Sequence, residues 1–74
     1  MFGGKAPLHT AYLVGITHAD QSVEVYAVLT LTMAEARAAV AALAPTGCQV
    51  AVMGALSRTV ARKLRLELDE VRLL

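Results

Sequence analysis

Two apolar segments separated by a polar segment dominate the first half of the chain. Residues 8–16, LHTAYLVGI, are rich in β-branched and aromatic side chains, which are typical of strands. Residues 17–22, THADQS, are polar and fit a turn. Residues 23–31, VEVYAVLTL, alternate between apolar and polar side chains at first and then become apolar. This pattern predicts an antiparallel hairpin whose second strand passes into the interior of a sheet.

Residues 32–47, TMAEARAAVAALAPTG, give the clearest helical pattern in the chain. Thr32 is a good N-cap residue, and Glu35 stands three positions later, which completes a capping box. Pro45 and Gly47 are expected to end the helix. Four apolar residues three to four positions apart are predicted to share its packing face: Met33, Ala36, Val40 and Leu43.

A continuous apolar segment, CQVAVM, covers residues 48–53 between two glycines. Such a segment fits a strand that is buried on both faces, as in a parallel pairing. Because a helix precedes it and a helical pattern follows, we expect a crossover that returns the chain to the hairpin sheet.

The last twenty residues carry two competing periodicities. Apolar residues recur every four positions from Leu56 to Leu64, as on a helix, and every two positions from Leu64 to Leu68, as on a strand. We predict a helix from about Ser57 to Arg65, a turn, and a short final strand in EVRLL. The alternative is one helix that continues to the C-terminus.

The predicted element order is therefore β-β-α-β-α-β in one domain over residues 1–74. This order corresponds to an α/β or α+β fold in which helices cover a small mixed sheet.

The composition bears on partners and location. The chain has 74 residues, of which 57% are hydrophobic and 18% charged, against roughly 25% charged in a typical domain. A core this small cannot cover all of these apolar side chains, so we expect a homodimer through an apolar surface and allow a different protein partner. The single cysteine and the lack of a recognisable signal segment predict a cytoplasmic protein. No uncharged apolar segment approaches the roughly 18 residues of a membrane span.

The segment from the end of the third strand into the second helix could bind an anion. A helix N-terminus offers free backbone N–H groups and a partial positive charge. The candidate cofactor-binding residues are Gly54, Ala55, Ser57 and Arg58. The same residues also fit an ordinary strand-to-helix connection, because capping alone explains Ser57.

Only three side chains are candidate ligands for a soft metal ion. His9 begins the first predicted strand and His18 follows its end, so about 30 Å of strand separates them and one chain cannot use both in one site. Cys48 opens a predicted buried strand, where cysteine usually behaves as a small hydrophobic residue. His9 and Cys48 are kept as candidate metal ligands.

Positive charge is concentrated in the predicted second helix. Arg58, Arg62 and Arg65 share one helical stripe, which could contact the phosphates of a nucleic acid. The stripe has no aromatic neighbours and an acidic segment follows it, so a solvated face is the competing interpretation. No paired carboxylates, nucleophile elbow or Ser-His-Asp set is apparent, and we do not expect a free-standing enzyme.

The order of these motifs resembles the dinitrogenase iron–molybdenum cofactor biosynthesis family. Phe2-Gly3 looks like the end of a His-Phe-Gly motif and Ala6-Pro7 like its Ala-Pro, although Met1 stands where the histidine would be. The segments AYLVGITHADQSVEV, PTGCQVAVMGALSRTVARKL and DEVRLL are similar to the family's hairpin, its strand-turn-helix and its last strand. The family's first strand has no counterpart, and GALS lacks a second glycine.

This resemblance implies an RNase H-like domain that carries an iron–sulfur or iron–molybdenum type cluster or its precursor. The turn at residues 54–58 would then receive the cofactor, Arg58 would attract its negative charge, and His9 or Cys48 would be possible ligands. The alternative hypothesis is a protein–protein interaction or regulatory module whose basic helix contacts nucleic acid.

Overall fold

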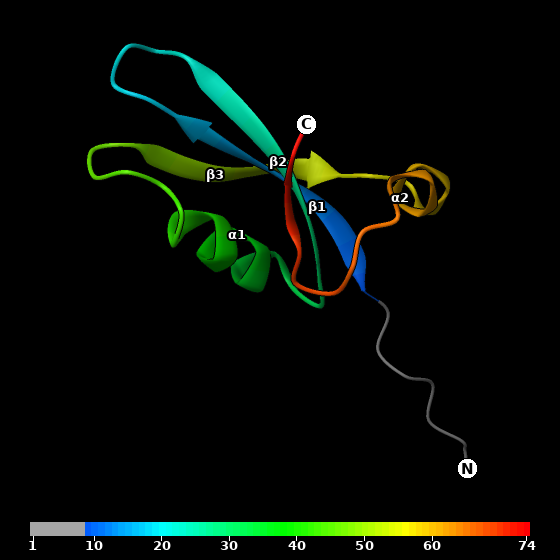
Figure 1. Cartoon of the computed structure of the whole chain (residues 1–74). Coiled ribbons are helices and arrows are strands. Elements are labelled where there is room, and N and C mark those ends of the chain that lie inside the picture. Colours follow the sequence, from blue (N-terminus) through cyan, green and yellow to red (C-terminus); the bar gives the residue numbers. More distant parts are fainter. Residues whose placement is uncertain (1–8) are drawn as a thin grey trace.

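The computed structural model describes residues 9–74, and the element order is the one that the sequence predicts (Figure 1). The elements are β1 (Thr10–Thr17), β2 (Val23–Thr30), α1 (Met33–Ala41), β3 (Gln49–Ala55), α2 (Arg58–Leu64) and β4 (Val71–Leu73). The final segment is a short helix followed by a strand, so the alternative of one helix running to the C-terminus is wrong. Neither helix, at nine and seven residues, is long and apolar enough to span a membrane.

The four strands form one sheet in the order β3-β1-β2-β4, and every pair of neighbouring strands is antiparallel. In the hairpin, Thr10 pairs with Thr30 at one end and Thr17 with Val23 at the other. The only parallel contact among the described residues is an isolated bridge between Leu29 and Leu68. β1 is therefore a central strand with partners along both edges.

The predicted parallel pairing of β3 is wrong. β3 lies at the edge of the sheet and runs antiparallel to β1, with Gln49 beside Thr17 and Ala55 beside Tyr12. The expected crossover does exist: α1 returns the chain across the sheet so that β3 runs in the same direction as β2. However, β1 lies between these two strands, and β3 therefore pairs with β1.

β3 also differs from the strand buried on both faces that its apolar composition suggested. Val50 and Val52 are partly buried against the core, whereas Ala51 and Met53 are exposed. A continuous apolar segment cannot distinguish a strand covered on both faces from an edge strand whose outer face is also apolar.

The hydrophobic core lies between α1 and one face of the sheet. Ala36 and Val40 of α1 are buried with Val14, Ile16 and Val28 of the sheet. In Figure 1, α1 crosses this one face, and α2 lies at the end of the sheet near the start of β1. The core is thin because one nine-residue helix supplies its whole second layer.

The predicted capping box at the start of α1 is confirmed. The Glu35 backbone N–H donates to Thr32 Oγ1 at 3.1 Å, and Glu35 Oε1 accepts from the Thr32 backbone N–H at 3.2 Å. The predicted packing face is right for Ala36 and Val40 only. Leu43 is 59% exposed because α1 ends at Ala41, before a further turn could direct Leu43 toward the sheet. Met33, the first helical residue, is 58% exposed.

Arg72 of β4 holds the C-terminal segment together. Its guanidinium donates to the Leu64 carbonyl oxygen at the end of α2 and forms an ion pair with Glu70 at 2.6 Å. Glu70 Oε1 also accepts the Glu67 backbone N–H at 2.9 Å. The pKa of the Glu70 carboxyl is lowered, mainly by this hydrogen bond from the Glu67 backbone and next by the hydrogen bond from Arg72.

The different burial of Val40 and Leu43 gives a paired test of the fold. Val40→Ala should lower the free energy of unfolding by about 2 kcal/mol, because it leaves a cavity in the core. Leu43→Ala should change it by less than about 0.5 kcal/mol. Urea denaturation of both variants measures the difference. Equal losses would contradict the position of α1.

A second prediction concerns the pH dependence of stability at Glu70. Because its folded-state pKa is lowered, ionised Glu70 stabilises the fold above the unfolded-state pKa, and this stabilisation is lost as the pH falls through the folded-state value. Glu70→Gln should therefore lower the thermal unfolding midpoint near neutral pH, and its difference from wild type should shrink in acid. Glu67→Gln, which leaves the Glu67 backbone N–H in place, is the control. A difference that stays constant with pH would rule out the Glu70 carboxylate as its source.

Candidate functional site

The antiparallel register of β1 and β3 brings the start of α2 to the start of β1. Ala55 at the end of β3 pairs with Tyr12, and the Leu56 backbone N–H donates to the Ala11 carbonyl oxygen at 2.8 Å. Leu56 and Ser57 then lead directly into α2, which lies beside His9 as a result.

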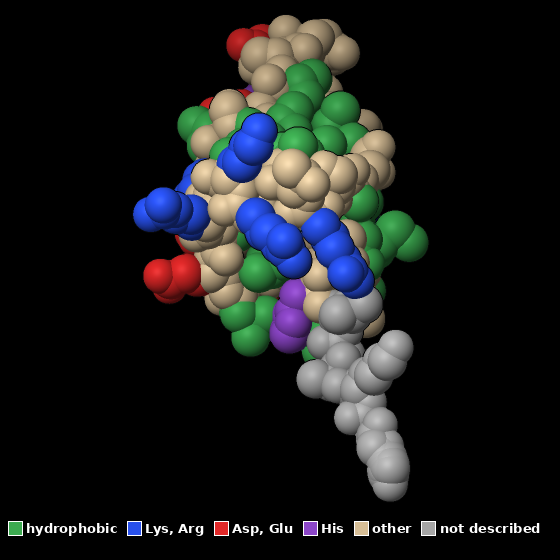
Figure 2. Space-filling view, turned by 90° about the vertical axis from the view of Figure 1, so that its right-hand side faces the viewer, with side chains coloured by type: hydrophobic (Ala, Val, Ile, Leu, Met, Phe, Trp, Pro, Cys, Tyr) green, Lys and Arg blue, Asp and Glu red, His purple; other side chains and the backbone are tan. Residues whose placement is uncertain are grey.

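A cavity of about 320 Å³ opens between α2 and this end of the sheet. A smaller cavity of about 200 Å³ adjoins it and shares several of its lining residues. Basic side chains gather on this face of the molecule, with a histidine next to them (Figure 2). The larger cavity is lined by His9, Leu29, Arg58, Ala61, Arg62, Arg65 and Leu66. It therefore combines three guanidinium groups and one imidazole with apolar side chains, and we name it the basic cavity.

None of the described residues that line this cavity is acidic. Within residues 9–74 the ion pairs are His18 with Glu24 and Arg72 with Glu70, so neither involves α2. In the acidic segment after α2, Glu70 forms its ion pair with Arg72 and not with an arginine of the cavity. None of the described carboxylates therefore forms an ion pair with the arginines of this cavity.

Of the four residues predicted to bind a cofactor at the end of β3, only one lines the cavity. Gly54 and Ala55 belong to β3 itself, and the space around Gly54 is open. Ser57 Oγ accepts the Val60 backbone N–H at 3.3 Å, so Ser57 caps α2. Arg58 lines the basic cavity, and the other three residues do not.

The two candidate metal ligands lie at opposite ends of β1. His9 lines the basic cavity, whereas Cys48 lies beside the other end of the strand, where Thr17 pairs with Gln49. The eight residues of β1 correspond to about 26 Å. Among the described residues, no group of three or more His, Cys, Asp and Glu side chains could hold a metal ion.

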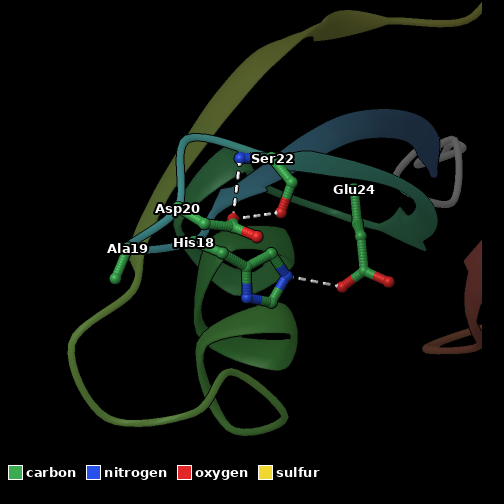
Figure 3. A pocket seen from close by; sticks show the side chains of 5 residues that line it. All are labelled: His18, Ala19, Asp20, Ser22 and Glu24. Atoms are coloured by element: carbon green, nitrogen blue, oxygen red, sulfur yellow. Dashed lines mark hydrogen bonds and ion pairs between the residues drawn. The ribbon is translucent and has the colours of Figure 1, made fainter.

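Cys48 instead contacts the histidine that we set aside as a partner for His9. Cys48 Sγ lies 3.3 Å from His18 Nδ1, and His18 Nε2 lies 2.8 Å from Glu24 Oε1. Glu24 also accepts a longer hydrogen bond of 3.4 Å from the Tyr26 hydroxyl. We name Cys48, His18 and Glu24 the thiol cluster. Figure 3 shows His18 and Glu24 directed toward one another beside the turn that connects β1 to β2.

The sequence contains a signal for this cluster, but it depends on the register. Glu24 and Tyr26 are two positions apart on β2 and so share a face, and Glu24 pairs opposite Ile16. The pairing of Thr17 with Gln49 puts the next residues outward, His18 and Cys48, side by side. In a parallel pairing with β2, Cys48 would still lie at this end of the hairpin, but β2 would separate it from the end of β1.

The turn before β2 is held by its own hydrogen bonds. Asp20 Oδ1 accepts from the Ser22 backbone N–H at 3.0 Å and from Ser22 Oγ at 2.6 Å, and the side-chain bond is the main cause of the lowered pKa of Asp20. The His18 backbone N–H donates to the Ser22 carbonyl oxygen at 2.8 Å. These bonds fix the backbone from which His18 extends.

Comparison with protein-family models, with curated proteins and with solved structures finds no match to this chain. The resemblance to the cofactor biosynthesis family therefore stays a prediction. Met1, Phe2-Gly3 and Ala6-Pro7, which carry the N-terminal part of that resemblance, lie outside the described residues.

The capping role of Ser57 can be tested by hydrogen exchange. Ser57→Ala should cost about 1 kcal/mol of local helix stability and should speed exchange of the Val60 amide about fivefold. Ser57→Asn, which keeps a good capping side chain, should retain the protection. Unchanged Val60 protection in Ser57→Ala would refute the cap and reopen an anion-binding role for the hydroxyl.

Proposed function

We propose that this protein is a small non-catalytic carrier or accessory domain that binds an anionic ligand in the basic cavity beside α2. The observation that supports this function best is the convergence of Arg58, Arg62 and Arg65 with His9 on one cavity, where none of the described lining residues is acidic. Guanidinium groups bind phosphate, carboxylate and similar oxyanions with charge-assisted hydrogen bonds. The apolar lining residues, Leu29 among them, would contact an uncharged part of the ligand.

A metal–sulfur cofactor or its precursor is the ligand class that the family resemblance implies. Direct ligation does not fit the residues of one chain, because the only cysteine, Cys48, lies at the other end of β1 from the cavity. Of the described residues that line the cavity, His9 is the only soft ligand. A metal–sulfur anion would therefore be held chiefly by charge and hydrogen bonds from the arginines.

The experiment uses two arginine variants and two anions. Titration calorimetry with tetrathiomolybdate and with inorganic phosphate should detect binding to wild type that weakens as salt is added. Arg58→Ala with Arg62→Ala should weaken it at least about tenfold, because each charge-assisted hydrogen bond contributes about 1.5 kcal/mol or more. Preference for tetrathiomolybdate over phosphate would support the metal–sulfur class.

The matched control is Arg37→Ala with Lys63→Ala. It removes the same charge, and neither residue lines the cavity. An equal loss of binding in this control would mean that net charge alone attracts the anion. Absence of binding by wild type at low salt would refute the proposed function.

Nucleic acid is the second candidate ligand. The basic side chains in Figure 2 are distributed over this face, and a nucleic acid needs such a distribution because its phosphates are spaced along the backbone. None of the described residues that line the cavity is aromatic, so their contacts with a nucleic acid would be made to phosphates. Fluorescence anisotropy with a single-stranded oligonucleotide distinguishes this candidate: the same arginine variants should weaken binding and flatten its salt dependence.

Self-association stays a proposal, and one surface supports it. Val23 and Met53 are more than half exposed, and both lie next to Gly15 on the sheet face that points away from α1. No helix covers this middle part of the sheet in Figure 1. A homodimer through this face, in the predicted cytoplasmic location, would cover the apolar area that the core cannot.

A further inference from the structure

The thiol cluster has no part in the proposed anion binding, and it lies at the opposite end of β1 from the basic cavity. Its three side chains come from three separate segments of the chain: the residue after β1, the start of β2 and the residue before β3. Cys48 Sγ, the His18 ring and Glu24 Oε1 follow one another at hydrogen-bonding distance, 3.3 Å and 2.8 Å apart. An arrangement this specific requires a chemical explanation.

The two His18 contacts define complementary roles for the two ring nitrogens. A carboxylate can only accept, so His18 Nε2 donates its N–H to Glu24. In the neutral ring this leaves the Nδ1 lone pair facing the Cys48 thiol. Rotating the ring by a half turn would place carbon atoms at both contacts, and the observed orientation is therefore the one that both partners favour.

This is the arrangement of a nucleophile, a base and a group that orients the base. Transfer of the thiol proton to Nδ1 would give a thiolate next to an imidazolium, and the Glu24 carboxylate would stabilise the positive ring. The Tyr26 hydroxyl donates to the same carboxylate oxygen. Burial, and then the charge of Glu24, raise the pKa of Tyr26, so Tyr26 stays a neutral donor that does not compete for the proton.

The cluster is reachable by small molecules. Cys48 is partly exposed. An open cavity of about 640 Å³ lies over His18 and Glu24, lined with Ala19, Asp20 and Ser22 of the turn (Figure 3). A second cavity of about 220 Å³ is lined by His18 and by Gly47 and Gln49, the two neighbours of Cys48 in sequence. Cys48 itself lines neither cavity, so an electrophile beside His18 would have to reach the sulfur through the partly exposed side of Cys48.

We propose that Cys48 is a nucleophilic thiolate site that exchanges with low-molecular-weight disulfides. The thiolate attacks one sulfur of the disulfide, a new bond forms from Sγ, and the original S–S bond breaks. The leaving sulfur departs with the bonding electron pair and takes the proton that His18 held. One protein thiol and one disulfide thus become one mixed disulfide and one small thiol, and the disulfide is the oxidant.

The chain holds a single cysteine, so a second protein thiol cannot resolve the mixed disulfide. The reaction therefore stops at one modification and is reversed by added thiol. Cys48 is the reacting residue, His18 the base, and Glu24 a positioning residue that acts through His18.

The test measures the rate at which oxidised glutathione modifies the protein, followed by intact-mass spectrometry at several pH values. Wild type should react faster than N-acetylcysteine, and most clearly below neutral pH, where a simple thiol is protonated. His18→Gln should slow the reaction at least about tenfold below neutral pH, and Glu24→Gln by a smaller factor. The variants should approach wild type at alkaline pH, which a purely structural role would not produce.

Two controls keep the result interpretable. Glu67→Gln removes a carboxylate outside the cluster and should react like wild type. Wild type unfolded in guanidinium chloride should lose its advantage over N-acetylcysteine, which tests the cluster without any substitution.

The proposal is overturned if folded wild type reacts no faster than N-acetylcysteine, or if His18→Gln leaves the rate unchanged. Protection of Cys48 that a chelator releases would show a bound metal instead and would also overturn it. Because anion binding is measured at the other end of β1, failure of either proposal leaves the other unaffected.

Discussion

The antiparallel pairing of β1 with both β2 and β3 is the constraint on which the rest of the structure depends. β1 is the only strand that contributes to both long pairings, and two of its buried residues, Val14 and Ile16, belong to the core beneath α1. Because side chains alternate along a strand, a shift of one residue in either pairing would turn the core side chains outward. The buried face of α1 therefore selects the register, and the register fixes which residues meet at each end of β1.

Both candidate sites follow from this single register. The last residues of β3 pair with the start of β1, so α2 begins there and its arginines lie close to His9. The first residue of β3, Gln49, pairs with the last residue of β1, and Cys48 therefore lies beside His18. A positively charged cavity and a thiol cluster thus occupy opposite ends of one strand, which is the physical basis for treating them as independent sites.

The sequence predicted the elements well where a local interaction decides them. The capping box of Thr32 and Glu35 involves residues three positions apart, and the cap at Ser57 likewise depends on its own helix. The left-handed conformation of Arg65 (φ 53°) ends α2 and separates it from β4, where the sequence had left two alternatives open. Leu43 was assigned to the core because periodicity continues past the true end of α1, and periodicity alone does not show where a helix stops.

The sequence by itself determined the order of the elements, the capped start of α1 and the concentration of arginines in α2, because these depend on neighbouring residues. The tertiary structure alone decided that β3 pairs with β1 rather than with β2. Strand pairing is a choice between edges far apart in the sequence, and an apolar strand such as residues 48–53 satisfies either edge. Pairing with β1 placed Cys48 directly beside His18, with no strand between them, and it brought the three arginines of the α2 segment into the lining of a cavity at the start of β1.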